Sequence, residues 1–242
     1  MNRRKSCRGF TLSELLVAGV LMGVVLLLSY TFFHYGVSSS EVTRTTIEVQ
    51  QATNASTYRM SREMLETNPI TVEFFPNASS PDAPVGVVFL SARDANNTFQ
   101  CHPISGRPIW QKAVGYFLDT DPEFGADNVQ GLYRAEIVPA GLPFPDLVTP
   151  SSLAVSTATL RSSGQNRQLV AHGVLAPSAS RPHGGFDVYS EFADGSKTYD
   201  LPSSPVYMDL ELINYRSGNA AWIAGQDNSN SIVSHLRLDL RD

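Results

Sequence analysis

The feature that most constrains this chain is a long apolar run close to its N-terminus. From Leu15 to Phe33, only Ser29 and Thr31 interrupt a series of apolar, Gly and Ala residues. A helix needs about 20 such residues to cross the hydrocarbon core of a membrane. The run therefore predicts one transmembrane helix.

A basic segment precedes the run and predicts its orientation. It contains Arg3, Arg4, Lys5 and Arg8 and no acidic residue. By the positive-inside rule, this end stays in the cytoplasm and the bulk of the chain lies outside it. A secretory signal has a similar start but a shorter apolar region, followed by a small-residue cleavage site. Val37-Ser38-Ser39 leaves such cleavage open as an alternative.

Glu14 is a carboxylate at the start of this apolar run, and it needs a partner. An ionised side chain within a membrane helix costs about 2.5–3.5 kcal/mol on insertion scales, so it is usually kept for a specific contact. A cut after Gly9 would give Phe10 a positive α-amine near Glu14, where the helix dipole also favours negative charge. An amine on a neighbouring subunit would serve equally. The alternative is a Glu14 that is merely solvated by lipid headgroups.

The segment Gly9-Phe10-Thr11-Leu12-Ser13-Glu14-Leu15-Leu16-Val17 closely resembles the cleavage and methylation signal of type IV pilins and type II secretion pseudopilins. The resemblance implies that a prepilin peptidase cuts after Gly9 and that Phe10 becomes the N-methylated terminus. It implies that Glu14, fifth in the mature chain, pairs with a subunit's N-terminal amine during assembly. Other pilin or pseudopilin subunits and inner-membrane lipid are the implied partners. Many major pilins have a proline midway along this helix, whereas the first proline here is Pro69.

Gly19 and Gly23 form a small-xxx-small step within the apolar run. Such a step lets another helix approach closely, so it is a candidate for helix packing. Glycine is also frequent in membrane helices that have no interface at that point. Both interpretations stay open.

Composition divides the chain near residue 68. All 15 prolines lie at or after Pro69, and 13 of the 17 glycines lie beyond residue 68. We therefore expect a leader peptide at 1–9, a transmembrane and amphipathic helix at 10–67, and a β-rich extracytoplasmic globular domain at 68–242. Asn68-Pro69 ends the helix, because the residue before proline is pushed out of the helical region.

The second half of the predicted helix has one charged sector and two apolar stripes when residues are placed at 100° steps. Apolar side chains on both flanks suit a helix that rests on its own domain and also meets other subunits. They equally suit an ordinary amphipathic helix that uses both flanks for one core. The charged sector holds Glu41, Arg44, Glu48, Arg59, Arg62, Glu63 and Glu66; the first stripe holds Val42, Val49, Met60 and Met64; the second holds Ile47, Tyr58 and Leu65.

The remainder of the chain carries strand signals, so the predicted fold class is α+β: a long N-terminal helix packed on a C-terminal antiparallel β-sheet domain. Alternation of apolar and polar residues indicates strands with one face on a core. Asp194-Gly195 predicts a hairpin, and residues 139–165 read as long loops. The predicted strands are 71–75, 85–90, 113–118, 132–138, 168–175, 186–192, 198–201, 206–214 and 232–240.

Parts of this region also resemble the larger minor pilins, the PilW-like proteins or J-type pseudopilins. The likeness lies in Val114-Gly115-Tyr116-Phe117-Leu118, Gly131-Leu132-Tyr133-Arg134, residues 169–174 and 186–189, and a terminal strand rich in Arg and Leu. Together with the size of the domain, it favours a minor component over a major pilin.

Charge argues against general nucleic-acid binding. The chain has 18 basic and 23 acidic residues, and removal of the four basic residues of the leader leaves 14 against 23, a net charge of −9. Neutralisation of phosphate supplies most non-specific affinity for nucleic acid, and an acidic domain lacks it. A local basic patch of Arg161, Arg167 and Arg181 near the long loops is the alternative.

Two cysteines occur, and one of them, Cys7, lies in the leader. Cys101 then stands alone in the mature chain, so no intrachain disulfide is expected there. We expect Cys101 to be a buried small hydrophobic residue rather than a reactive thiol.

An acidic cluster is the candidate metal site, with calcium as the ion because calcium takes several carboxylate and carbonyl oxygens. Its members are Asp119, Asp121, Glu123 and Asp127. Phe124 stands where an EF-hand loop needs glycine, and a solvated acidic turn is the alternative. No other metal and no cofactor is predicted.

The sequence predicts a structural subunit rather than an enzyme. It has no H-E-x-x-H, G-x-S-x-G or P-loop pattern, and its five histidines show no metal-ligand spacing. The predicted function is that of a minor pilin or pseudopilin that joins or primes a filament. The alternative is a signal-anchored envelope domain that binds a ligand or hydrolyses a substrate without polymerising.

Overall fold

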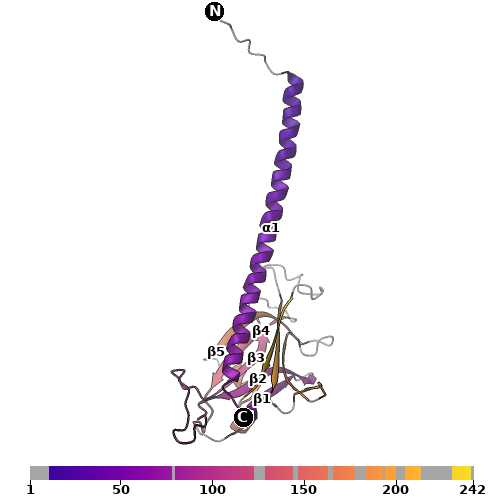
Figure 1. The fold of residues 1–242 in the computed structure, drawn as a ribbon. Coiled ribbons are helices and arrows are strands. Elements are labelled where there is room, and N and C mark those ends of the chain that lie inside the picture. Colours follow the sequence, from indigo (N-terminus) through magenta and orange to yellow (C-terminus); the bar gives the residue numbers. More distant parts are fainter. Residues whose placement is uncertain are drawn as a thin grey trace, which may run out of the picture. The chain divides into compact units, whose positions relative to one another are not determined.

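The structure is a computed structural model, and it describes residues 11–77, 80–122, 129–143, 147–162, 166–177, 184–192, 194–199, 205–213 and 231–240. The chain divides into two compact units, residues 1–45 and 46–242. Helix α1 (Leu12–Met64) begins in the first unit and ends in the second (Figure 1). The predicted α+β layout, a long N-terminal helix followed by an antiparallel β-sheet, is confirmed.

The end of α1 follows from local chemistry. Its 53 residues contain no proline. After Met64 the chain makes a turn in which the amide of Thr67 donates to the carbonyl of Met64 at 3.0 Å. Asn68 then caps the short 3-10 helix η1 (Pro69–Thr71), and its side chain accepts a hydrogen bond from the amide of Ile70. α1 thus ends at Met64, a turn before Asn68-Pro69 and short of the predicted limit at residue 67.

The second unit is built on one antiparallel sheet. Every predicted strand overlaps an observed one, although among the described residues of 198–201 only Thr198 is in a strand. Among the described residues the strands are β1 (Val72–Asn77), β2 (Ser80–Ser91), β3 (Lys112–Thr120), β4 (Val129–Ile137), β5 (Arg167–Leu175), β6 (Phe186–Glu191), β7 (Lys197–Thr198), β8 (Val206–Ile213) and β9 (Ser231–Leu238).

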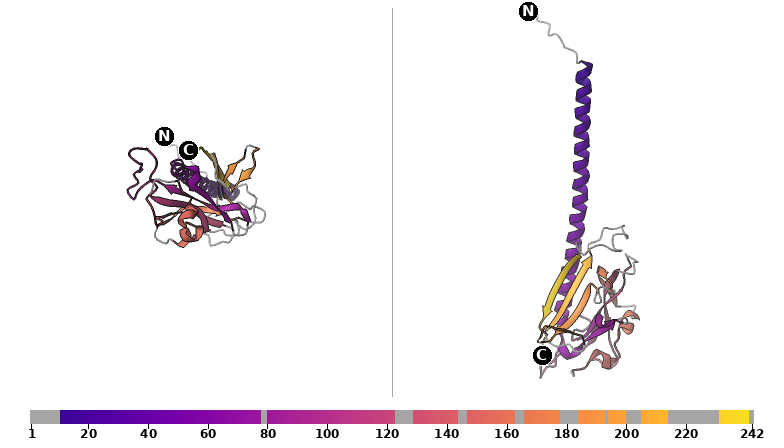
Figure 2. Two further views of the ribbon diagram at one scale, coloured as in Figure 1. Left: turned by 90° about the horizontal axis from the view of Figure 1, so that it is seen from below. Right: turned by 90° about the vertical axis from the view of Figure 1, so that its right-hand side faces the viewer.

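The order of the strands is β1-β2-β3-β4-β5-β8-β6-β7, with β9 pairing with β8. Strands β1 to β5 follow chain order, and β5 meets β8 through the single pair Val174 and Leu212. Strand β8 pairs with β6 and, over its whole length, with β9. Figure 2 shows β8 and β9 side by side. The predicted hairpin at Asp194-Gly195 is confirmed as the connection between β6 and β7.

Apolar side chains cover both faces of the sheet at β2 and β3. On β2 and β3, residues such as Phe89, Tyr116 and Leu118 belong to a core that also contains Met60 and Met64 of α1. Their neighbours in sequence, such as Leu90 and Phe117, belong to a second core on the opposite face. Successive residues of a strand point to opposite faces, so two buried faces explain why β3 is buried at every position from Ala113 to Leu118.

The second core corrects the prediction of long loops at 139–165. This stretch contains the 3-10 helix η2 (Pro150–Leu153) and helix α2 (Thr157–Ser162). Val155 and Leu160 of this stretch are buried in the second core. Leu160 packs directly over Gly115, where an added Cβ would clash with it. A few apolar residues in a polar stretch are enough to fold it onto a strand face that would otherwise be exposed.

The last turns of α1 bury one of the two predicted stripes. Met60 and Met64 are fully buried and Val49 nearly so, whereas Ile47, Tyr58 and Leu65 are exposed. Val42 has its side chain outside the described residues. Within the second unit the helix thus uses one stripe for its own core and leaves the other uncovered. The contact of this uncovered stripe with other subunits stays a prediction.

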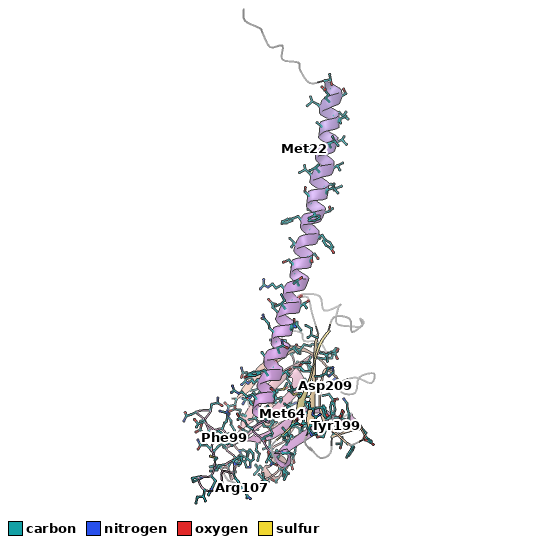
Figure 3. All side chains as sticks on the ribbon, in the orientation of Figure 1. Met22, Met64, Phe99, Arg107, Tyr199 and Asp209 are labelled. Atoms are coloured by element: carbon teal, nitrogen blue, oxygen red, sulfur yellow. The ribbon has the colours of Figure 1, made fainter. Side chains whose placement is uncertain are left out.

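The predicted burial of Cys101 is wrong. Cys101 is exposed. It lies between β2 and β3 in a segment held by its own backbone pairs, such as Cys101 with Pro108 and the amide of His102 with the carbonyl of Arg107 at 2.8 Å. Figure 3 labels Phe99 and Arg107 on the same segment. The backbone of this hairpin-like segment pairs with itself, and the Cys101 side chain is not packed in either apolar core.

Candidate functional site

The start of α1 holds Glu14 in a defined position. The Thr11 amide donates a hydrogen bond to Oε2 of Glu14 at 2.8 Å, and the Thr11 hydroxyl donates to the same oxygen at 3.0 Å. The amide of Glu14 lies 3.4 Å from the Thr11 hydroxyl oxygen. Thr and Glu three residues apart that bond each other's amides form a capping box, which satisfies free amides at a helix start. The Thr-x-x-Glu pattern in the sequence is the signal that could have predicted this role of Thr11.

The capping box sets the chemistry of the Glu14 carboxylate. The group is exposed, and it lies in the first turn, where the helix dipole favours negative charge. One of its oxygens holds the helix start, and the carboxylate is accessible to a cation from outside the chain. Gly9 and Phe10, the predicted cleavage and methylation residues, lie outside the described residues.

The first unit presents a continuous apolar surface. α1 is long and apolar enough to cross a membrane. Its large apolar side chains are exposed throughout this part, for example Leu16 at 65% and Met22 at 67% (Figure 3). Such a surface is stable only in lipid or against other apolar helices.

Small and polar residues in the apolar run are compatible with both environments. The hydroxyl of Ser29 donates to the carbonyl of Val25 at 2.8 Å, and that of Thr31 donates to the carbonyl of Leu28 at 2.9 Å. Each hydroxyl therefore donates its hydrogen bond within the helix and does not need water as a partner. At Gly19 and Gly23 an added Cβ would meet nothing within 4 Å, so both glycines lie on open helix surface. Their predicted role in helix packing stays a prediction.

A known protein family matches the N-terminal part of the chain, which includes Glu14 and most of the apolar run. Residues 4–30 match the family described as the prokaryotic N-terminal methylation motif. The chain carries a prepilin-type N-terminal motif. This prepilin-type motif supports a pilin-like or pseudopilin-like role in general, and with it processing by a prepilin peptidase and assembly with other pilins. No curated protein and no solved structure matches the chain significantly.

Two of the four residues proposed to bind calcium, Asp119 and Asp121, contact different partners within the domain. Asp119 pairs with Arg167 at 2.7 Å. The Asp121 side chain is fully buried, and it bonds Nδ1 of His172 at 3.0 Å and the amide of Gly173 at 3.1 Å. Glu123 and Asp127 lie outside the described residues. Within the described ranges no three His, Cys, Asp or Glu residues gather closely enough to hold a metal ion. Calcium binding by the four together stays a prediction.

Two of the three arginines of the predicted basic patch are engaged within the domain. Arg161 donates to the carbonyl of Leu118 at 3.0 Å. Arg167, besides its contact with Asp119, has its guanidinium carbon 3.7 Å from the centre of the Tyr133 ring. Arg181 lies outside the described residues. Arg161 and Arg167 therefore make contacts within their own domain.

Sequence reasoning missed a polar group that joins α1 to the sheet. Oε2 of Glu63 accepts hydrogen bonds from the hydroxyl of Tyr116 at 2.8 Å and from Nε of Arg134 at 2.9 Å. The helical pattern puts Glu63 in the charged sector of the helix. It is partly buried because Arg134, from β4, reaches across the sheet surface to pair with it. The helical pattern alone holds no signal for a partner on a strand 71 residues away.

Proposed function

We propose that this protein is a minor pilin or pseudopilin, a structural subunit that joins or primes a type IV pilus or a type II secretion pseudopilus. The observation that carries the proposal is the prepilin-type motif at residues 4–30. In this function a prepilin peptidase cleaves between Gly9 and Phe10, and Phe10 is then N-methylated.

The geometry of the helix start supports an assembly role for Glu14. The capping box holds its carboxylate at the first turn of α1, four residues after the proposed new terminus Phe10. The terminal amine of an adjacent subunit is a cation that can reach such a group in the membrane, where an unpaired carboxylate is unfavourable. Other pilin or pseudopilin subunits are thus the proposed partners.

Two surfaces of α1 support a subunit that packs against others. The apolar residues of the first unit are exposed, and so is the stripe of Ile47, Tyr58 and Leu65 in the second unit. The basic leader predicts an N-terminus in the cytoplasm. We therefore place the protein in a bacterial inner membrane, as a single-pass protein with its β-rich domain outside the cytoplasm, from which it enters a filament.

A second candidate is a signal-anchored envelope domain that does not polymerise. It is favoured by the same apolar helix, which fits a plain membrane anchor equally well. The two candidates differ in the chemistry of the mature N-terminus, because only the first requires cleavage after Gly9.

Mass analysis of the mature N-terminus tests the proposal. The full chain is expressed with a prepilin peptidase, extracted from membranes and digested. The expected product begins at an N-methylated Phe10. An intact Met1, or a start near Ser40, would contradict the proposal. Gly9→Leu is the matched control, because it alters the cleavage residue and leaves the apolar helix unchanged; it is expected to retain the leader.

A further inference from the structure

One lysine and two carboxylates meet on the sheet face that points away from α1. Nζ of Lys197 lies 2.8 Å from Oδ2 of Asp187 and 3.8 Å from Oδ2 of Asp209. It also lies 3.6 Å from the centre of the Tyr189 ring. The three residues come from β7, β6 and β8, which are neighbours in the sheet. None of them takes part in the proposed assembly site.

The members of the group differ in their exposure to solvent. The Asp187 side chain is 7% exposed, whereas the Lys197 side chain is 39% exposed, so the ammonium end reaches inward from an exposed stem. Burial, reinforced by nearby aspartates, raises the pKa of both Tyr189 and Tyr199 above the usual tyrosine value. The buried carboxylate of Asp187 therefore lies in direct contact with the lysine amine.

The strand register places the two carboxylates directly opposite each other. Asp187 pairs with Asp209 across β6 and β8. Like charges directly opposite in a sheet are destabilising. The Lys197 ammonium between them offsets this repulsion, and Nδ1 of His235 holds Asp209 from the other side at 2.8 Å. The arrangement supplies an amine, an acid for it to attack, and a second carboxylate that can accept a proton.

We propose that Lys197 and Asp187 form an intramolecular isopeptide bond. The ammonium first passes a proton to Asp187, which leaves a neutral amine and a neutral carboxylic acid. The Nζ lone pair then attacks Cγ of Asp187, and a new C–N bond forms. The amine proton moves to Asp209, which returns it to the departing hydroxyl as the C–O bond breaks. The products are one amide and one water, and no oxidant, reductant or cofactor is consumed.

Neighbouring side chains have defined parts in this reaction. The hydroxyl of Tyr199 lies 3.4 Å from Oδ2 of Asp187 and can donate to the oxygen on which negative charge develops. The hydrogen bond from His235 positions Asp209. Nζ and Oδ2 already touch, so attack requires only a small movement of the flexible lysine end. The product would fix the two-residue strand β7 to β6 covalently.

A second lysine pair in the same domain serves as an internal control. Nζ of Lys112 lies 2.9 Å from Oε2 of Glu136, a distance close to that of Lys197 and Asp187. Arg134 also bonds Glu136, and the cations beside it keep the pKa of Glu136 below its usual value against the effect of burial. A carboxylate held ionised is a poor acceptor for an amine. We expect no amide between Lys112 and Glu136.

Peptide mass analysis of the full chain, extracted in detergent and digested with trypsin, tests the proposal. The expected result is a peptide containing both Asp187 and Lys197 that is uncut after Lys197 and about 18 Da lighter than calculated, the mass of one water. The peptides of Lys112 and Glu136 are expected at their calculated masses. If Lys197 is cleaved normally and every peptide keeps its calculated mass, even after prolonged incubation, the proposal is wrong.

Two variants separate the bond from a simple ion pair. Lys197→Arg keeps the positive charge and the contact with Tyr189 but is not expected to form the amide, so the mass loss should vanish. Asp209→Asn keeps the shape of the proton acceptor without its basicity, and the yield of the light peptide should fall at least about tenfold, as expected when a general base is removed. A mass loss that persists in Lys197→Arg, or that also appears at Lys112, would overturn the assignment.

Discussion

Glu63 on α1 and Arg134 on β4 form an ion pair 2.9 Å long, with side chains only 16% and 9% exposed. Tyr116 donates to the same carboxylate oxygen, and Arg134 extends the contact to Glu136, which also binds Lys112. Met60 and Met64, on either side of Glu63 in α1, are fully buried. The polar group therefore fixes the rotation of the last turns of α1 on the sheet, which apolar packing alone specifies less sharply.

Replacement of Glu63 by alanine should destabilise the second unit strongly. It leaves the Arg134 guanidinium and the Tyr116 hydroxyl without their shared acceptor, and breaking a buried pair from one side costs about 3–5 kcal/mol. Arg62→Ala is the control, since that side chain is exposed and a change of at most about 0.5 kcal/mol is expected. Urea unfolding of both variants in detergent measures the difference. Equal stability of the two would contradict the role of Glu63.

Tyr116 should make stability depend on alkaline pH. Burial, followed by the negative charge of Glu63, raises the pKa of Tyr116 above its usual value near 10. The neutral form is thus favoured in the folded state, so its contribution is complete below about pH 10 and is lost as pH rises further. The free energy of unfolding, measured from about pH 8 to about pH 11, should fall at the alkaline end. Tyr116→Phe should flatten this fall only in part, because the pKa values of Tyr189 and Tyr199 are raised as well.

The exposed position of Cys101 predicts that its thiol reacts in the native protein. A maleimide should label Cys101 in the folded chain as fast as in urea, within about threefold, because thiol reactivity follows exposure and thiolate fraction. Cys101→Ser should change the free energy of unfolding by less than about 0.5 kcal/mol. Protection of the thiol until the chain unfolds would show that it is covered.

The sequence predicted the elements that have a strong period and missed features that depend on distant contacts. The strands could be predicted because alternation marks their buried faces, and the two apolar stripes of α1 because they repeat at the helical period. The burial of Glu63 and of Leu160 could not, because each depends on one partner, Arg134 or Gly115, on a strand far along the chain. Thr11 and Glu14 were recognisable as a capping box, whereas the meeting of Lys197 with Asp187 required the register of β6 and β7.

The exposed stripe on α1 should matter for assembly and little for folding. Tyr58 is 69% exposed, and Met60, two residues away, is fully buried. Tyr58→Ala is expected to change the free energy of unfolding by less than about 0.5 kcal/mol, whereas Met60→Ala should lower it by about 2–5 kcal/mol. In a filament the Tyr58 variant should be incorporated several-fold less than the unmodified chain. Quantitative immunoblots of sheared filaments test this, and normal incorporation would exclude the stripe as a contact.

Glu14 offers the sharpest test of assembly, because its two roles can be separated. Glu14→Ala removes both the negative charge and the capping box, so we expect cleavage after Gly9 to continue while incorporation into a filament is lost. Glu14→Gln preserves the capping geometry, since Gln can also bond the Thr11 amide, but it removes the charge. If an N-terminal amine of another subunit pairs with Glu14, the Gln variant should be nearly as defective as the Ala variant. Normal incorporation of Glu14→Gln would mean that Glu14 acts only by capping α1, and the matched variant Thr11→Ala, which weakens the cap by about 1 kcal/mol and keeps the charge, would then be the defective one.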